Sequence, residues 1–124
     1  MSADRQQLGQ AGEELAARFL SQRGHIILAR NYRKKFGEID IISRNGQTLV
    51  FTEVKTRRSQ LYGTAAQAVT LRKQQQIARV AEEYLMEKQL VDCPARFDVV
   101  CVDIASNGAA NCTLIENAFE LPNW

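Results

Sequence analysis

Residues 37–55 read GEIDIISRNGQTLVFTEVK, and this stretch decides the fold. Both halves are rich in Ile, Val, Phe and Thr, which are enriched in β-strands. Asn45-Gly46 separates the halves, and this dipeptide is the strongest short-range signal for a two-residue hairpin turn. The stretch therefore predicts two antiparallel strands, over residues 38–43 and 48–54.

The turn also predicts how the two strands pair. With Asn45-Gly46 as the loop, Arg44 lies opposite Gln47, and Asp40 lies opposite Phe51. Paired residues share a face, and side chains return to that face every two residues. One face of the hairpin is therefore expected to carry Glu38, Asp40, Phe51, Glu53 and Lys55.

Asp40 and Glu53 are diagonal neighbours in this pairing, with Cα atoms about 7–8 Å apart, so both carboxylates can reach one metal ion. Their strands are apolar, and an unpaired buried carboxylate costs several kcal/mol. Local rules broken at neighbouring positions are typical of a functional site. The spacing alone leaves open a buried ion pair of Lys55 with Glu53 or Asp40.

Residues 6–23 predict an amphipathic helix that ends at Gly24. On a helical wheel, Glu13 falls about 20° beyond Leu20, at the rim of the apolar arc. Glu14 points into solvent. If this helix offers a carboxylate to an interior site, we expect it to be Glu13.

The rest of the chain completes an α/β or α+β pattern of order α-β-β-β-α-β-β, in one domain spanning residues 1–124. A short strand at 25–29 precedes a basic loop at 30–36. After a polar loop at 58–63 and one or two helical turns at 65–69, Thr70 caps a helix that ends near Gln89. The last predicted elements are a strand at 97–104, an Asn107-Gly108 turn and a short strand at 113–115.

Composition excludes several kinds of protein. The three cysteines have no CxxC spacing, which argues against a disulfide framework and a thiolate zinc site. A single histidine, His25, excludes most histidine-based nucleophile schemes and is expected to be structural. No apolar run can cross a membrane and no signal peptide is evident, so we expect a cytosolic protein.

Positive charge is concentrated near the predicted hairpin. The segment from Arg30 to Arg58 holds eight basic and three acidic residues, although the whole chain carries a net charge of only +2. Such asymmetry suits a polyanionic partner, or else is a solvated basic face. Candidate phosphate contacts are Arg30, Arg33, Lys34, Lys35, Arg57 and Arg58. Tyr32 and Tyr62 are either base-stacking residues or ordinary surface tyrosines.

The hairpin resembles the split signature of PD-(D/E)xK nucleases, in which an Asp on one strand is followed by Glu-x-Lys on the next. Asp40 and Glu53-Val54-Lys55 occupy these positions, and Ile39 stands where the signature usually has Pro. The resemblance implies a restriction-endonuclease-like core, a mixed β-sheet flanked by helices.

More narrowly, the chain resembles the YraN-like family of small bacterial proteins, itself similar to archaeal Holliday junction resolvases. The matching motifs follow in order over nearly the whole chain: Gly12-Glu13, residues 29–32, Gly37 to Asp40, Phe51 to Arg57, Tyr62-Gly63, Lys73-Gln74 and residues 96–100. Because resolvases act as dimers, the resemblance also suggests a homodimer.

The resemblance implies a magnesium- or manganese-dependent endonuclease acting on nucleic acid, with DNA favoured over RNA. Asp40, Glu53, the carbonyl of Val54 and Glu13 would bind the metal. Hard oxygen ligands of this kind favour Mg²⁺ or Mn²⁺ over Zn²⁺. Lys55 would orient or deprotonate the attacking water. Gln67 and Glu38 are accessory positions.

Two other hypotheses are compatible with the sequence. The fold could bind branched or single-stranded nucleic acid without cutting it, as a module of a larger repair or recombination assembly. It could also be a purely structural domain with a buried lysine–carboxylate pair.

Overall fold

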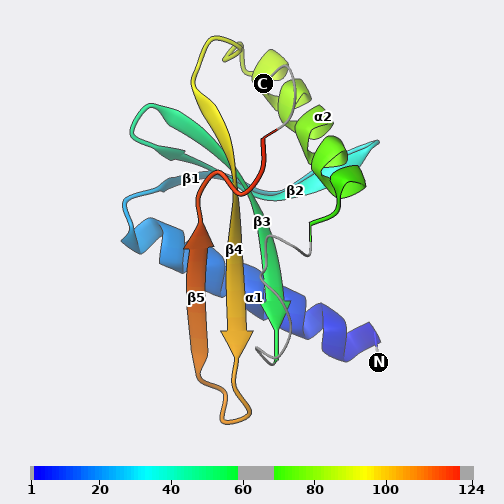
Figure 1. The fold of residues 1–124 in the computed structure, drawn as a ribbon, viewed down its shortest axis with the longest axis vertical. Helices are drawn as coiled ribbons and strands as arrows, with labels where there is room; N and C mark the ends of the chain where they lie inside the picture. Colours follow the sequence, from blue (N-terminus) through cyan, green and yellow to red (C-terminus); the bar gives the residue numbers. More distant parts are fainter. Residues whose placement is uncertain (1, 59–68, 121–124) are drawn as a thin grey trace.

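The computed structural model describes residues 2–58 and 69–120, with side chains from residue 7 onward (Figure 1). The elements are α1 (Ser2–Gln22), β1 (Ile26–Lys34), β2 (Gly37–Asn45), β3 (Thr48–Arg57), α2 (Leu71–Glu87), β4 (Ala95–Ile104) and β5 (Ala110–Ile115). The predicted order α-β-β-β-α-β-β is confirmed, and the fold is mixed α/β.

A single sheet joins all five strands in the order β1-β2-β3-β4-β5. The β3–β4 pair is parallel and the other pairs are antiparallel. A parallel pair needs a long crossover, and α2 lies within it. No helix in the described part of the chain is long and apolar enough to span a membrane.

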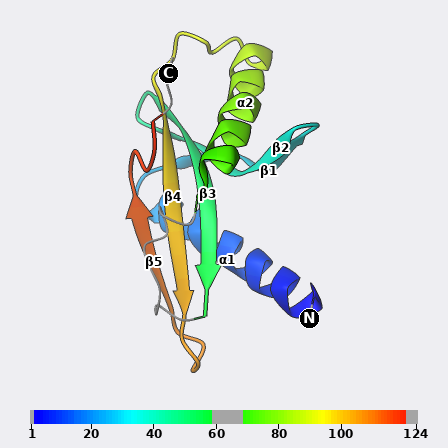
Figure 2. The same cartoon turned by 45° about the vertical axis from the view of Figure 1, so that its right-hand side comes forward.

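The two helices pack on opposite faces of the sheet and make two separate cores. Neighbouring residues of β4 alternate between them, because Val99 packs in the cluster with α2 and Val100 in the cluster with α1. Leu20 and Ala16 bring α1 to one face, while Ile77 anchors α2 on the other. Figures 1 and 2 show α1 and α2 on the two sides of the strands.

The second helix begins as the sequence predicts. Thr70 is extended and its Oγ1 accepts a 3.2 Å hydrogen bond from the N–H of Lys73, which is the geometry of an N-cap. Six apolar residues along its inner face are buried: Ile77, Ala78, Val80, Ala81, Tyr84 and Leu85. The predicted turns at 65–69 lie almost entirely outside the described residues.

The predicted basic loop at 30–36 is wrong. Most of this segment belongs to β1, which pairs with β2 as far as Lys34 opposite Gly37, and only Lys35 and Phe36 form the turn. β1 is an edge strand, so its charged side chains keep access to water while its backbone pairs on one side only. A run of basic residues was therefore not sufficient to predict a loop.

The predicted pairing of the central hairpin is also wrong, by two residues. Asn45 pairs with Thr48, so the loop consists of Gly46 and Gln47. Gly46 has a φ of 64° while Gln47 is not among the residues with positive φ, which fits a type II′ turn with glycine first. The shift of two residues preserves which side chains share a face. It aligns Asp40 with Glu53 instead of Phe51.

The sheet forks at this point. The β2–β3 pairing ends at Ile41 opposite Thr52, after which β2 continues with β1 and β3 continues with β4 as far as Arg57 opposite Asp103. Figures 1 and 2 show the cyan end of the β1–β2 hairpin turning away from β3. Asp40 and Glu53 are the first residues beyond the last shared pair.

Candidate functional site

Asp40 stands where the regular strand pairing is interrupted on both sides. Its Oδ2 accepts a 2.8 Å hydrogen bond from the backbone N–H of Val54, so a side chain satisfies this donor at the fork. On the other side, the β1–β2 pairing skips Asn31 and Asp40. Ile39 and Ile42 both pack in the α2 cluster, which strict alternation forbids for residues three apart. The fork thus turns the Asp40 carboxylate toward β3.

Glu53 is the buried partner of Asp40. It is 7% exposed, and it lies close enough to Asp40 for the two carboxyl groups to shift each other's pKa. Burial, followed by the negative charge of Asp40, raises the pKa of Glu53 to about 7. Burial also raises the pKa of Asp40, against the lowering effect of the Val54 N–H. The pair therefore tends to hold a proton near neutral pH.

Two lysines lie near this pair, but neither is within hydrogen-bond distance of Glu53. Lys55 Nζ is 3.7 Å and Lys73 Nζ is 3.9 Å from the same oxygen of Glu53, Oε2. Both distances exceed those of a direct hydrogen bond. Each lysine is about one-third exposed, so solvent screens its attraction for Glu53. The ion pair that the spacing left open exists, but it is loose.

Lys73 is the member of this group that the sequence reasoning did not select. It lies in the first turn of α2, more than a dozen residues after the end of β3. The chain connection between β3 and β4 brings its ammonium group near Glu53. Only the Lys73-Gln74 motif hinted at it, and no spacing rule connects residue 73 with residue 53.

Glu13 lies beside the pair but does not join it. It is half-buried on α1, and its pKa is raised by burial first and then by the negative charge of Asp40. The side chain of Asn31 lies near enough to oppose this rise in the pKa of Glu13. A cavity of about 360 Å³ between α1 and β3 is lined by Leu8, Gly9, Glu13, Val54 and Thr56. Glu13 therefore faces open space next to the fork.

Asn31 is a second residue that the sequence reasoning missed. Its φ of 52° is left-handed, a conformation that Asn adopts more readily than most residues. It occupies the position opposite Asp40 that the β1–β2 pairing skips. Unusual backbone held in place by its surroundings is common at functional sites.

The two central acids fit a hard divalent cation. Within the described residues, no three His, Cys, Asp or Glu side chains are close enough together to hold a metal ion. Mg²⁺, however, commonly uses one or two protein carboxylates and fills its remaining positions with water and substrate phosphate. Two adjacent carboxylates, one half-buried and one buried, with raised pKa values and no directly hydrogen-bonded lysine, suit that mode of binding.

Most of the predicted phosphate contacts have an acidic partner. Glu38 pairs with Arg33 at 3.1 Å, and Glu87 accepts hydrogen bonds from both Tyr32 and Lys34. The other pairs are Arg30 with Glu14 at 2.9 Å and Arg57 with Asp103 at 3.0 Å. Arg58 is exposed at the end of β3. Tyr62 and Gln67 lie outside the described residues.

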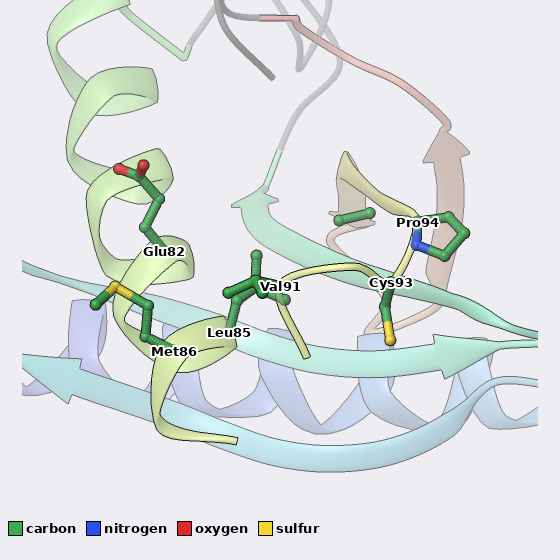
Figure 3. A pocket seen from close by; sticks show the side chains of 7 residues that line it. Glu82, Leu85, Met86, Val91, Cys93 and Pro94 are labelled. Carbon is green, nitrogen blue, oxygen red and sulfur yellow. The ribbon is translucent and has the colours of Figure 1, made fainter. Parts of the chain in front are cut away.

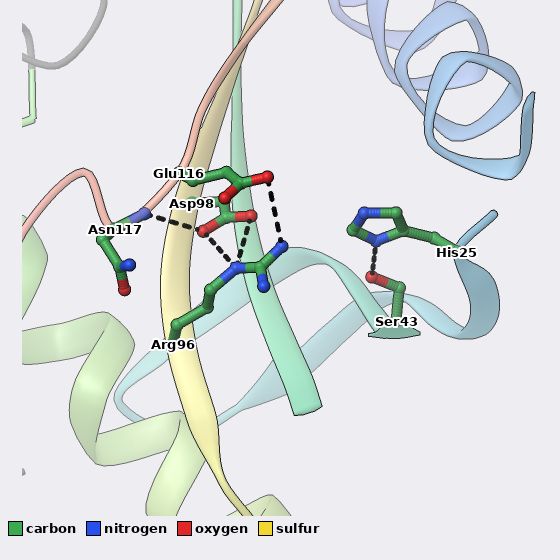
Figure 4. Close-up of polar contacts among 6 residues, drawn as sticks. All are labelled: His25, Ser43, Arg96, Asp98, Glu116 and Asn117. Atoms are coloured by element: carbon green, nitrogen blue, oxygen red, sulfur yellow. Dashed lines mark hydrogen bonds and ion pairs between the residues drawn. The ribbon is translucent and has the colours of Figure 1, made fainter. Parts of the chain in front are cut away.

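Two further features lie away from the fork, and none of the candidate site residues belongs to them. A cavity of about 480 Å³ runs between the end of α2 and the start of β4, with Leu85, Met86 and Val91 in its lining (Figure 3). Figure 4 shows a polar network in which Asp98 binds Arg96.

His25 has the structural setting that its apolar neighbours predict. Its Nδ1 lies 2.9 Å from Ser43 Oγ, and both residues are buried. Burial, followed by the positive charge of Arg96, lowers its pKa. The three cysteines are free thiols, as expected.

Comparison with known proteins finds one family. The family described as uncharacterised protein family UPF0102 matches residues 12–102. UPF0102 protein STH1475 of Symbiobacterium thermophilum is 50% identical over 112 residues, covering 90% of this chain and 95% of that protein. UPF0102 protein GSU0650 of Geobacter sulfurreducens is 48% identical over 114 residues, covering 92% and 89%. A UPF0102 protein of Caldicellulosiruptor saccharolyticus is 45% identical over 117 residues, covering 94% and 99%.

Proposed function

This chain belongs to uncharacterised protein family UPF0102, and from that premise we propose that it is a metal-dependent endonuclease acting on DNA. The proposal rests on one observation above all. Half-buried Asp40 and buried Glu53 lie together at the fork of the sheet with raised pKa values, and neither nearby lysine is within hydrogen-bond distance of Glu53. The resemblance of this hairpin to the PD-(D/E)xK signature supports the same activity.

Asp40, Glu53 and the carbonyl of Val54 would hold Mg²⁺ or Mn²⁺, and Glu13 would complete the set of metal ligands. When bound, such an ion polarises the phosphate and lowers the pKa of a coordinated water. The hydrogen bond from the Val54 N–H fixes the Asp40 carboxylate, so its geometry is set before substrate arrives. Burial keeps the pair in a weakly screened environment, where its attraction for a cation is strong.

Lys55 and Lys73 would act on the substrate. Both ammonium groups lie just outside hydrogen-bond distance of Glu53, so each is free to turn toward a phosphate oxygen. Lys55 would hydrogen-bond the attacking water and stabilise the negative charge that develops at phosphorus. Lys73 would supply a second positive charge from α2.

The basic residues of β1 and β3 would hold the flanking phosphates. On β1, the acidic partners of Arg30 and Lys34 are exposed, and surface ion pairs contribute little to stability. A phosphate can therefore compete for these side chains at low cost. Electrostatic contacts of this kind give affinity without sequence preference and weaken with salt. As in the resolvases that the family resembles, the active unit would be a homodimer.

A cleavage assay tests the proposal. Labelled single-stranded, duplex and branched DNA would be incubated with the protein in Mg²⁺, in Mn²⁺ and in EDTA. We expect metal-dependent cleavage that falls by at least about a hundredfold in Asp40→Asn, Glu53→Gln and Lys55→Met. Glu82→Gln, which changes an exposed acid on α2, serves as the matched control and should cleave normally.

Each remaining outcome bears on the proposal. Cleavage that survives in Asp40→Asn and Glu53→Gln would show a contaminating nuclease or a different site. Binding with no cleavage in either metal would favour the non-cleaving nucleic-acid module instead. Absence of both binding and cleavage, even at low salt, would favour a structural domain.

A further inference from the structure

An exposed aromatic ring stands at the tip of the β1–β2 hairpin. Phe36 is 39% exposed, although its side chain is large and apolar. The guanidinium carbon of Arg79, on α2, lies 3.4 Å from the centre of the ring, and Lys35 Nζ lies 5.9 Å from it. The ring therefore carries a stacked guanidinium and a second cation while keeping part of its surface open.

A row of polar residues on α2 leads from the forked acids to this ring. Lys73, Gln76 and Arg79 follow one another at intervals of three, so they share one face of the helix. Lys73 lies near Glu53, and Gln76 packs beside Gly37, the first residue of β2. Arg79 then covers Phe36. Figures 1 and 2 show the cyan tip of the hairpin alongside α2.

The spacing suits one nucleic-acid strand. Asp40 lies four positions after Phe36 in the chain, a span of about 13 Å at most for an extended strand. That span corresponds to roughly four stacked nucleotides, which advance about 3.4 Å each. A strand with one phosphate at Asp40 and Glu53 can therefore bring a nearby base to Phe36, with Lys73 and Arg79 beside the phosphates between them.

We propose that Phe36, held by Arg79, is a stacking platform for an unpaired base of the DNA substrate. The inference rests on the proposed function and narrows its substrate class to DNA with a single-stranded segment near the cleaved bond. A base in continuous duplex is covered on both faces by its neighbours and cannot stack on a protein ring. An unpaired base can, and an aromatic side chain accepts any base because every base has a π-face.

The structure favours Phe36 over Tyr32, one of the two tyrosines that the sequence singled out for this role. Tyr32 packs edge-on against Tyr84 with ring centres 5.2 Å apart, and its hydroxyl is bound to Glu87. Its ring is therefore used inside the protein. Phe36 combines exposure, neighbouring positive charge and a path to the candidate site.

The test measures binding without a divalent ion, so it is independent of cleavage. Fluorescence anisotropy in EDTA would give affinities for a single-stranded oligonucleotide, a tailed duplex and a blunt duplex. A 2-aminopurine in the single strand reports stacking through quenching of its fluorescence. Phe36→Leu keeps the apolar bulk and removes the π-face, whereas Phe36→Tyr keeps the ring. Leu28→Ala, which shortens another exposed apolar side chain of β1, is the control.

We expect Phe36→Leu to lose roughly tenfold in affinity for the single-stranded and tailed probes, to lose the quenching, and to bind blunt duplex unchanged. Phe36→Tyr and Leu28→Ala should match the wild type. An equal loss on all three probes, no loss, or a Phe36→Tyr variant as weak as Phe36→Leu would overturn the inference. So would a wild-type protein that binds none of the probes.

A second variant guards against misfolding of the first. Arg79→Met keeps an unbranched apolar stem over the ring and removes the guanidinium, and it should weaken single-strand binding more than duplex binding. Asp40→Asn separates the two proposals. If it leaves this binding intact and neither protein cleaves DNA, the nuclease proposal fails while the stacking platform stands.

Discussion

The carboxylate of Asp40 accepts a 2.8 Å hydrogen bond from the backbone N–H of Val54. Val54 lies between Glu53 and Lys55, so this one contact ties the acid of β2 to the strand segment that carries the other two candidate residues. It forms where β2 separates from β3, and it replaces a backbone pair that the fork has removed. The geometry of the site therefore follows from the point at which the sheet divides.

The metal-free protein should become less stable as pH rises. The pKa of Glu53 is about 7 in the folded protein against 4.5 for the unperturbed group, so the folded state binds more protons between these values. The free energy of unfolding should fall across this window, by up to about 3 kcal/mol. The raised pKa of Asp40 acts in the same direction. Urea unfolding in EDTA at several pH values from 4 to 8 measures this dependence.

Glu53→Gln supplies the comparison for that experiment. Without the ionisable group, the free energy of unfolding should depend less on pH. The variant should be more stable than the wild type above pH 7. The exposed Glu82→Gln should keep the wild-type slope. A wild-type protein whose stability rises from pH 5 to 8 would show that the Asp40–Glu53 pair is not strained by its own charge.

Asp98, another buried acid, should stabilise the fold through its hydrogen-bonded partners. It is fully buried, both of its oxygens lie 3.1 Å from Arg96 Nε, and it accepts a hydrogen bond from the Asn117 N–H (Figure 4). Asp98→Ala leaves the largely buried Arg96 charge with only the exposed Glu116, 3.8 Å away, so we expect a loss of roughly 3–5 kcal/mol in urea unfolding. Asp98→Asn keeps an acceptor and should lose less. A loss below about 1 kcal/mol in Asp98→Ala would contradict this assignment.

Two glycines of α1 should respond with opposite signs to the same change. A Cβ at Gly12 would lie 1.9 Å from Thr56 Oγ1, whereas a Cβ at Gly9 would meet nothing within 4 Å. Gly12→Ala should therefore cost roughly 1–3 kcal/mol by forcing α1 away from β3. Gly9→Ala should gain up to about 1 kcal/mol from helix propensity. Chemical denaturation of both variants measures the change in the free energy of unfolding. Changes of the same sign would contradict the close approach of α1 to β3 at Gly12.

Much of the fold could be predicted because its signals are local. Thr70 caps its helix through a contact three residues away, and the strand-rich segments around Asn45-Gly46 do form a hairpin. The pairing was predicted two residues out of place because glycine took the first turn position and not the second. The grouping of Asp40 with Glu53 survived, since a shift of two residues preserves the face.

The parts that could not be predicted depend on long-range packing. Lys73 reaches Glu53 only because the crossover returns α2 to the fork, and Arg79 meets Phe36 for the same reason. The strand character of residues 30–34 comes from pairing with β2, which outweighs the charge of the segment. Glu13 was selected from its place on the helical wheel, but its proximity to Asn31, a left-handed residue in a strand, could not be predicted.

Asn31 offers a matched pair of variants for that unusual backbone. Its φ of 52° suits glycine and strains alanine, so Asn31→Ala should be about 1–2 kcal/mol less stable than Asn31→Gly. Both variants lose the Asn31 side chain and its effect on Glu13, which cancels in the comparison. Thermal and urea unfolding measure the difference. Equal stability would mean that residue 31 does not hold a left-handed conformation in solution.

The most direct test of the central claim is an anomalous-difference map from a crystal soaked in Mn²⁺. The account predicts a peak between the carboxylates of Asp40 and Glu53, within coordination distance of both, and no peak there in crystals of Asp40→Asn. A wild-type map without density at this position, or with Lys55 and Lys73 closed onto Glu53 in its place, would contradict the account.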